Sequence, residues 1–153
     1  MKITEIFYSL QGEGKLTGTP SAFIRISGCP LRCRWCDTKY AWDPTVGIDY
    51  SLDKILNSVN RLNTDFVVIT GGEPITHPQL PDLTHLLKSA GKHRPIETAA
   101  VKFVPDLACD LMSISPKLNN SLPLDPTLAA EHKAKCLNIQ SIKSLIAQYD
   151  YQL

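Results

Sequence analysis

A short, continuously apolar run between two amphipathic segments is the feature of this sequence that most limits its fold. The run is "FVVIT", residues 66–70, and it lacks the alternation of a half-exposed strand. Such runs are typical of parallel strands buried on both faces. Apolar residues at helical spacing precede it at 52–62 and follow it at 83–90. This alternation predicts an α/β fold with a mostly parallel sheet.

Local signals predict the remaining strands and helices. Further strands are expected at residues 2–11, 21–27, 94–99 and 110–115. Ser51 is expected to cap the helix that follows it, Gly91 to end the next helix, and Asp125-Pro126 to begin another. A last helix is expected to bury one apolar face, formed by Ile139, Ile142, Leu145 and Ile146. Ligands bind at the carboxyl ends of parallel strands, so residues after 27 and after 70 are expected to face one cleft.

Composition predicts one domain, residues 1–153, that needs no disulfide to fold. The chain is 43% hydrophobic and 20% charged, as is usual for globular proteins in water. Its net charge of +1 gives no reason to expect a nucleic-acid or anionic-membrane partner. No secretory signal is visible and no apolar run could span a bilayer, so the expected location is the cytoplasm. The five cysteines are therefore expected as metal ligands, catalytic groups or free thiols.

Three of those cysteines lie close together in "CPLRCRWCDT", as Cys29, Cys33 and Cys36. Pro30 favours a loop here, and a loop can wrap three thiolates around one centre. A structural zinc site needs four protein ligands, and neither Cys109 nor Cys136 has a second cysteine near it in the sequence. A [4Fe-4S] cluster with three ligands and one open iron is the alternative. The spacing alone leaves both alternatives open.

The residues around the cysteines carry a resemblance to a known family. C-x3-C-x2-C followed by "GGEP" at 71–74 resembles the radical S-adenosylmethionine superfamily. The resemblance implies a partial (β/α) barrel in which S-adenosylmethionine binds the open iron of the cluster. It also implies that the "GGEP" backbone meets the cofactor's amino group, and glycine permits such a close approach.

Three further stretches narrow the resemblance. "SLQGEG" near the start, "CDT" after the cluster loop and "SPK" at 115–117 are similar to the 7-carboxy-7-deazaguanine synthase family. The similarity covers nearly the whole chain in the family's order. It implies a ring contraction in which 6-carboxy-5,6,7,8-tetrahydropterin becomes 7-carboxy-7-deazaguanine with loss of ammonia, in the pathway to queuosine and other deazapurines. A 5′-deoxyadenosyl radical starts this reaction in the family.

The same resemblance implies roles for individual residues. The pterin substrate is expected at Leu10, Gln11, Gly12, Arg25 and Thr70. S-adenosylmethionine is expected at Trp35, Cys36, Asp37, Gly72, Ser115, Pro116 and Lys117, and Mg²⁺ at Thr38. The family further implies a homodimer and an electron donor such as flavodoxin or ferredoxin. Read without the resemblance, Arg25 could instead lie on the solvent face of an edge strand. His77, His85, His93 and His132 are expected at the surface or in helices, and Cys109 and Cys136 as ordinary thiols.

The sequence departs from the family pattern in two places. Where relatives carry "ETNGT" or "ETSGT", this chain has "ETAAV", so Ala99 and Ala100 replace a polar residue and a glycine. The final "YDYQL" is similar to the start of a strand that continues in relatives, so C-terminal strands are expected to be missing. Two alternative functions are a glycyl-radical activating enzyme and a degenerate cluster- or zinc-binding module without catalytic activity.

Overall fold

The computed structural model describes residues 1–153 as one mixed α/β unit. The strands are β1 (Lys2–Leu10), β2 (Pro20–Ile26), β3 (Ile48–Asp49), β4 (Val67–Gly71), β5 (Pro95–Thr98), β6 (Leu111–Ile114) and β7 (Tyr151–Gln152). The helices are α1 (Leu52–Asn60), α2 (Leu80–Ser89), α3 (Pro126–Lys133) and α4 (Ile139–Gln148). Single 3-10 turns occur at η1 (Gly14–Leu16), η2 (Lys39–Ala41), η3 (Pro74–Thr76) and η4 (Asn119–Ser121). No helix combines the length and the apolar character needed to cross a bilayer.

The strands form one sheet in the order β3-β1-β2-β4-β5-β6-β7. β1 runs antiparallel to both of its neighbours, and every pairing from β2 to β7 is parallel. The sheet does not close, since β3 and β7 lie at its two edges. These observations confirm the predicted α/β class and mostly parallel sheet. β2 is an interior strand, so the alternative that placed Arg25 on a solvent-facing edge strand is wrong.

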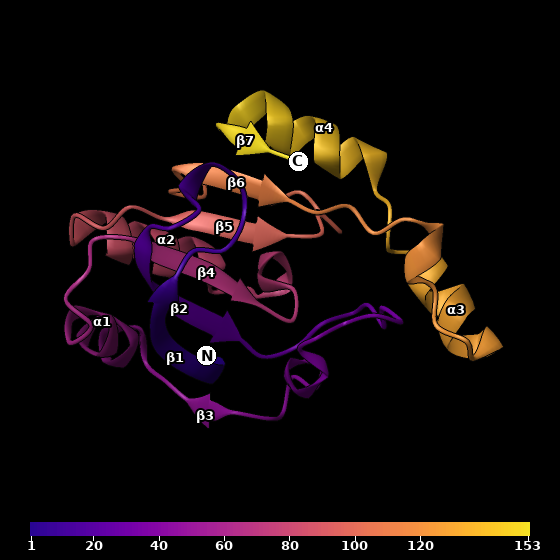
Figure 1. Cartoon of the computed structure of the whole chain (residues 1–153), viewed down its shortest axis with the longest axis horizontal. Helices are drawn as coiled ribbons and strands as arrows, with labels where there is room; N and C mark the ends of the chain where they lie inside the picture. Colours follow the sequence, from indigo (N-terminus) through magenta and orange to yellow (C-terminus); the bar gives the residue numbers. More distant parts are fainter.

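The main core lies between the sheet and helices α1 and α2, which cover one of its faces (Figure 1). Ile24, Ile69 and Ile96 form a row across β2, β4 and β5, and all three side chains are fully buried. Ile55 from α1 and Leu83 from α2 belong to the same core. Full burial of a side chain of this size is worth about 1.5–3 kcal/mol. The apolar run at 66–70 therefore forms most of β4, the buried parallel strand that the sequence predicted.

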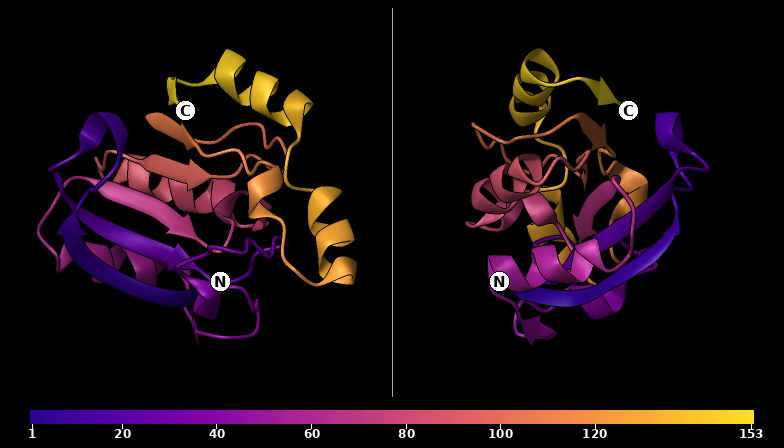
Figure 2. Two further views of the ribbon diagram at one scale, coloured as in Figure 1. Left: turned by 45° about the vertical axis from the view of Figure 1, so that its right-hand side comes forward. Right: turned by 90° about the vertical axis from the view of Figure 1, so that its left-hand side faces the viewer.

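The opposite face of the sheet is partly enclosed by the turn between β1 and β2. The turn approaches the far edge of the sheet, as the two views in Figure 2 show. The backbone N–H of Lys15 donates to Gln152 Oε1 at 2.8 Å, and Lys15 Nζ donates to the carbonyl of Tyr151 at 2.9 Å. These two contacts connect the turn between β1 and β2 to β7. They pass over a hollow that is lined by the face of the sheet opposite α1 and α2.

Helix boundaries follow the predicted signals. The hydroxyl of Ser51 accepts the N–H of Lys54, and the carboxylate of Asp125 accepts that of Leu128. Each contact satisfies a backbone donor that the first turn of a helix leaves free. Gly91 follows α2 with φ at 75°, a conformation that costs glycine little.

Candidate functional site

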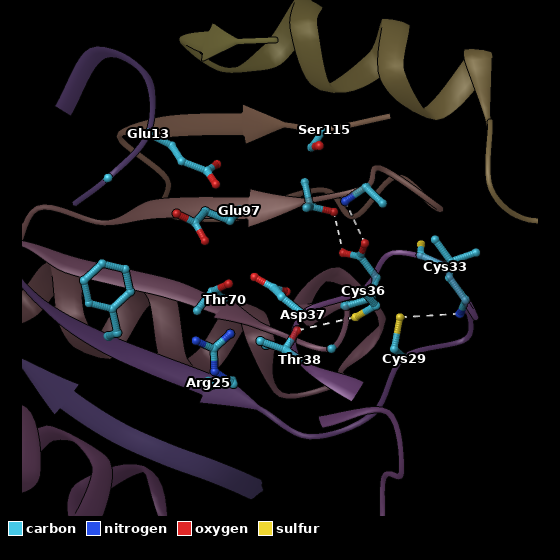
Figure 3. Close-up of a pocket in the computed structure, with 18 of the residues that line it drawn as sticks. Glu13, Arg25, Cys29, Cys33, Cys36, Asp37, Thr38, Thr70, Glu97 and Ser115 are labelled. Carbon is cyan, nitrogen blue, oxygen red and sulfur yellow. Dashed lines mark hydrogen bonds between the residues drawn. The ribbon is translucent and has the colours of Figure 1, made fainter. Parts of the chain in front are cut away.

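A cavity of about 570 Å³ opens at the carboxyl ends of the parallel strands, beside the loop that follows β2 (Figure 3). The prediction that residues after 27 and after 70 share a cleft is confirmed. The predicted site residues that line this cavity are Leu10, Gln11, Gly12, Arg25, Cys29, Cys33, Trp35, Cys36, Asp37, Thr38, Thr70, Gly72, Ser115 and Lys117. Pro116 does not line it; this residue faces a neighbouring hollow of about 390 Å³ near Lys15 and Gln152.

The three clustered cysteines lie on one loop at one end of the cavity (Figure 3). The N–H of Cys36 donates to the carbonyl of Cys33 at 3.1 Å, which closes a tight turn between them. The N–H of Cys29 donates to Trp42, which fixes the start of the loop. Burial raises the pKa of Cys29 to about 12 and also raises the pKa of Cys33. Without a metal these two groups are therefore neutral thiols at physiological pH, and metal binding has to displace their protons.

The placement of the thiols tests which metal group they fit. No three His, Cys, Asp or Glu side chains lie close enough together to share a single metal ion. A mononuclear zinc site needs its ligands converged on one point. In an iron–sulfur cluster each cysteine binds a different iron, so the sulfurs stand further apart. Cys29, Cys33 and Cys36 are the cysteines that line the cavity, and a set of three fits a cluster with one open iron better than a structural zinc site, which needs four protein ligands.

The glycines of "GGEP" have a structural reason that the sequence did not reveal. The N–H of Gly72 donates to the carbonyl of Ile26, and the N–H of Glu73 donates to that of Gly28, both at 2.9 Å. A Cβ atom at Gly72 would overlap with the backbone of Gly28. The close approach of these two backbones therefore joins the end of β4 to the end of β2. The N–H groups of Gly72 and Glu73 are both used in these hydrogen bonds.

Glu73 links this strand end to the next one. Its carboxylate accepts the hydroxyl of Thr98 at 2.5 Å and the N–H groups of Ala99 at 2.7 Å and Ile75 at 3.4 Å. The side chain is buried and forms no salt bridge, although the charge of Lys117 favours its ionised form. Burial raises the pKa of Glu73, although the three hydrogen bonds oppose the shift. Glu73 was not among the predicted site residues, although it stands inside a recognised motif.

The "ETAAV" segment keeps a backbone shape that favours glycine. Ala100 has φ at 58° and is fully buried, at the position where the family pattern has glycine. For an alanine, this left-handed conformation costs about 1–2 kcal/mol. The N–H of Ala100 donates to the hydroxyl of Thr98 at 2.9 Å, which helps to hold the turn. The turn at Ala100 therefore has a left-handed backbone that glycine would adopt at little cost.

Arg25 is held by residues from outside the cavity. Its Nε donates to Glu5 Oε1 at 2.7 Å, and the hydroxyl of Tyr40 donates to the same oxygen at 2.8 Å. Burial raises the pKa of Glu5, but the hydrogen bonds from Arg25 and Tyr40 outweigh it, so the net shift is downward. The terminal nitrogens of Arg25 donate to no protein acceptor and lie near Thr70 (Figure 3). They remain available to an anion in the cavity.

Glu97 is a cavity residue that sequence reasoning missed. It lies near the carboxyl end of β5, and its Oε1 accepts the amide Nε2–H of Gln11 at 2.9 Å. The amide oxygen of Gln11 accepts the N–H of Glu13 at 3.1 Å, which fixes the orientation of the amide. The position of Glu97 near the carboxyl end of a predicted strand was the signal that could have identified it.

The "SPK" run meets the cluster loop from the other side. Lys117 Nζ donates to the hydroxyl of Ser115 at 2.8 Å and lies 5.2 Å from the centre of the Trp35 ring. A cation at this distance from an indole is attracted to the face of the ring. The two segments expected to hold S-adenosylmethionine therefore contact each other.

Two residues outside the site contact the cysteine loop. His132 lies in helix α3, in agreement with its expected place at the surface or in a helix, but it is buried, and its ring accepts the N–H of Arg32 inside the cysteine loop. Burial lowers the pKa of His132. Cys136, expected to be an ordinary thiol, is a buried free cysteine that packs with Cys33 and Ala99 in a small apolar cluster.

The sheet, the cysteine loop and the strand-end motif define a radical S-adenosylmethionine domain, and the sequence model of the Radical SAM superfamily matches residues 23–119. Curated proteins named 7-carboxy-7-deazaguanine synthase are similar along most of the chain. The protein from Rhodopirellula baltica is 47% identical over 94% of this chain and 57% of its own length. The protein from Halobacterium salinarum is 42% identical over 100% of this chain and 62% of its own length.

A solved structure gives the same result. The crystal structure of QueE from Escherichia coli matches with a TM-score of 0.66 and 32% identity, over 95% of this chain and 75% of that one. The chain therefore belongs to the radical S-adenosylmethionine superfamily and, within it, to the 7-carboxy-7-deazaguanine synthase family. It spans about three-fifths of the length of the curated relatives it matches.

Proposed function

We propose that this chain converts 6-carboxy-5,6,7,8-tetrahydropterin to 7-carboxy-7-deazaguanine with loss of ammonia, as a carbon–nitrogen lyase of queuosine and deazapurine biosynthesis. One observation carries the proposal: three thiols of one loop and an arginine with free terminal nitrogens line the same cavity. Relatives that carry the synthase name are up to 47% identical to this chain, which supports the same reading.

In this proposal Cys29, Cys33 and Cys36 hold a [4Fe-4S] cluster as thiolates. S-adenosylmethionine lies beside it, against the cavity residues Trp35, Asp37, Gly72, Ser115 and Lys117. When bound, the two cofactors supply the one-electron radical chemistry of the reaction. The chain itself lines the cavity, which limits the access of water. It also orients the two cofactors, through the Trp35–Lys117 contact between their segments.

The substrate is proposed to lie over Leu10, Gly12 and Thr70 with its carboxylate on Arg25. A guanidinium group presents two parallel N–H donors to a carboxylate. Glu5 already accepts the Nε–H of Arg25, so the edge formed by the terminal nitrogens remains for the ligand. The paired side chains of Gln11 and Glu97 offer both amide and carboxylate groups, and these suit the donors and acceptors of a pterin ring.

Thr38 is proposed to bind Mg²⁺ through its hydroxyl. The hydroxyl lies 3.6 Å from Cys36 Sγ and lines the cavity, so a cation there would sit between the cluster loop and the substrate. Mg²⁺ keeps several water or substrate ligands, so one protein oxygen is a reasonable share of its coordination. Replacing Thr38 by alanine is expected to weaken the magnesium response of turnover and leave the cluster absorbance intact. A variant with unchanged magnesium dependence would remove Thr38 from the site.

The remaining parts of the proposal concern the cell. We propose a flavodoxin or ferredoxin as electron donor, because reduction of the cluster needs a one-electron carrier. A homodimer is proposed from family resemblance alone. A cytoplasmic location is proposed because thiol ligands have to stay reduced.

Anaerobic reconstitution tests the proposed cofactor. We expect about four iron and four sulfide per chain, as a [4Fe-4S] cluster requires. Alanine at Cys29, Cys33 or Cys36 should abolish the brown chromophore. Alanine at Cys109 or Cys136 serves as the control and should preserve it. Zinc in place of iron, or equal loss in the Cys109 or Cys136 variant, would overturn the three-cysteine model.

A further inference from the structure

A buried histidine connects the cysteine loop to the segment that follows "SPK". His132 lies on α3, and its Nδ1 accepts the backbone N–H of Arg32 at 2.9 Å. Its Nε2 lies 2.9 Å from the hydroxyl of Ser121. Ser121 Oγ in turn donates to the carbonyl of Leu118 at 2.6 Å. The chain of contacts therefore runs from the cysteine loop, through one imidazole, to the residue next to Lys117.

The hydrogen bonds determine which ring nitrogen carries the proton. Because a backbone N–H can only donate, Nδ1 of His132 has to accept from Arg32. The neutral ring then has its proton on Nε2, which donates to the hydroxyl of Ser121. That hydroxyl has its own proton free for the carbonyl of Leu118. Every donor and acceptor in the series is used, as buried polar groups require.

The series has a second link between the same two segments. The N–H of Arg34 donates to the backbone carbonyl of Ser121 at 2.8 Å. Arg32 and Arg34 flank Cys33 on the two sides, so both backbone contacts act on the part of the loop that carries this cysteine. Cys136, one turn beyond His132, packs against Cys33 itself. The region from η4 to the end of α3 thus lies against the cysteine loop and supports it. The ribbon of α3 lies beside this loop in the left-hand view of Figure 2.

We propose that His132 and Ser121 are positioning residues that hold the cysteine loop at a set distance from the Ser115–Lys117 run. The inference rests on the proposed role of Cys29, Cys33 and Cys36 as cluster ligands. Neither His132 nor Ser121 lines the cavity, so their action is through the backbone of residues 32–34 and 118. The loop has no strand pairing of its own, so these contacts, together with the hydrogen bonds inside the loop, fix the Cys33 region.

Three variants separate this role from simple packing. His132→Phe keeps a ring and removes both nitrogens. His132→Asn keeps an oxygen close to the position of Nδ1, so it can still accept from Arg32. Ser121→Ala removes the hydroxyl group that lies between His132 Nε2 and the carbonyl of Leu118. His85→Phe is the matched control, because His85 lies on α2, does not line the cavity and is partly exposed.

The measurements use reconstituted protein and need no turnover. The first is the rate at which a chelator removes the cluster absorbance. The second is the change in the spectrum of the reduced cluster when S-adenosylmethionine is added. Loss of a buried acceptor costs about as much as one hydrogen bond, which corresponds to about tenfold in an equilibrium. His132→Phe is expected to lose its cluster about tenfold faster and to need about tenfold more S-adenosylmethionine for the spectral change.

His132→Asn is expected to recover most of the loss in both measurements. Ser121→Ala is expected to show a smaller loss than His132→Phe. The control His85→Phe is expected to match the wild type. Circular dichroism of the apo-proteins verifies that each variant folds. If folded His132→Phe matches the wild type in both measurements, the proposal is wrong. The same holds if His132→Asn is as impaired as His132→Phe, since packing alone would then explain the loss. A wild-type chain that takes up no cluster would instead overturn the proposed function on which this inference rests.

Discussion

The hydroxyl of Thr98 donates a 2.5 Å hydrogen bond to the carboxylate of Glu73, and this contact joins the carboxyl ends of β5 and β4. The two residues are 25 positions apart in the chain. Glu73 stands in the strand-end motif "GGEP" and Thr98 in "ETAAV", and both residues line the cavity, so the contact connects the two motifs within the cavity wall. Its strength depends on burial, because water does not compete for either group.

We expect Glu73→Ala to destabilise the fold by about 3 kcal/mol, because three buried donors would lose their acceptor at about 1 kcal/mol or more each. Urea denaturation of the apo-protein measures this free energy of unfolding. Glu131→Ala, on the exposed side of α3, is the control and should change it by less than about 0.5 kcal/mol. Equal effects of the two substitutions would show that the Glu73 contacts contribute nothing to stability.

Gly72→Ala is expected to destabilise the protein by about 1–3 kcal/mol or more, because the added methyl group meets the backbone of Gly28. Gly12→Ala is the matched control, since no heavy atom lies within 4 Å of a Cβ at that position. The comparison of the two unfolding midpoints isolates the close approach from the general effect of replacing glycine. A Gly72→Ala protein as stable as the Gly12→Ala protein would contradict the packing described here.

Arg25→Lys is expected to weaken binding of the pterin carboxylate about tenfold, because lysine lacks the second parallel donor. Glu5→Ala is expected to weaken binding less, since it frees the guanidinium without removing it. Titration calorimetry with the substrate measures both dissociation constants. Lys2→Ala alters an ion pair with Asp49 at the sheet edge and is the control for a change to a basic side chain away from the cavity. If Arg25→Lys binds as tightly as the wild type, the carboxylate does not lie on Arg25.

Cys109 is expected to resist alkylation in the folded protein. Burial raises its pKa from 9.0 to about 12, so its thiolate fraction near neutral pH falls about a thousandfold. Mass spectrometry after iodoacetamide treatment measures the rate at this residue. The folded rate should rise with pH beyond pH 9, whereas the rate in urea should level off there. A folded rate equal to the denatured rate would contradict the burial of this thiol.

The same shift predicts how stability depends on pH. The folded state keeps the Cys109 proton above pH 9, whereas the unfolded state releases it. Stability from this group is therefore complete below pH 9 and is lost as the pH rises towards about 12. Cys109→Ser should flatten this part of the pH profile measured by urea denaturation. An unchanged slope would assign the alkaline loss to other groups.

Much of the fold could be predicted from short-range patterns in the sequence. The apolar run at 66–70, the helical spacing on either side of it and the caps at Ser51 and Asp125 are local signals. Each signal depends only on a residue and its near neighbours in the sequence, so it can be recognised without knowing which residues pack against it. The positions of the cysteine loop and of "GGEP" after predicted strands were sufficient to place both motifs at one cavity.

Only the tertiary structure decided what surrounds those motifs. Whether Arg25 lies on an edge or in the interior depends on β1, which pairs with β2 on the side away from β4. His132 meets Arg32 from 100 positions away, and no local pattern marks that pair. The sequence by itself therefore determined the elements and the chemistry they carry, because periodicity, capping and ligand spacing are local properties. The three-dimensional packing decided the order of the strands and the partners of the buried polar groups, because both depend on contacts between residues that are far apart in the sequence.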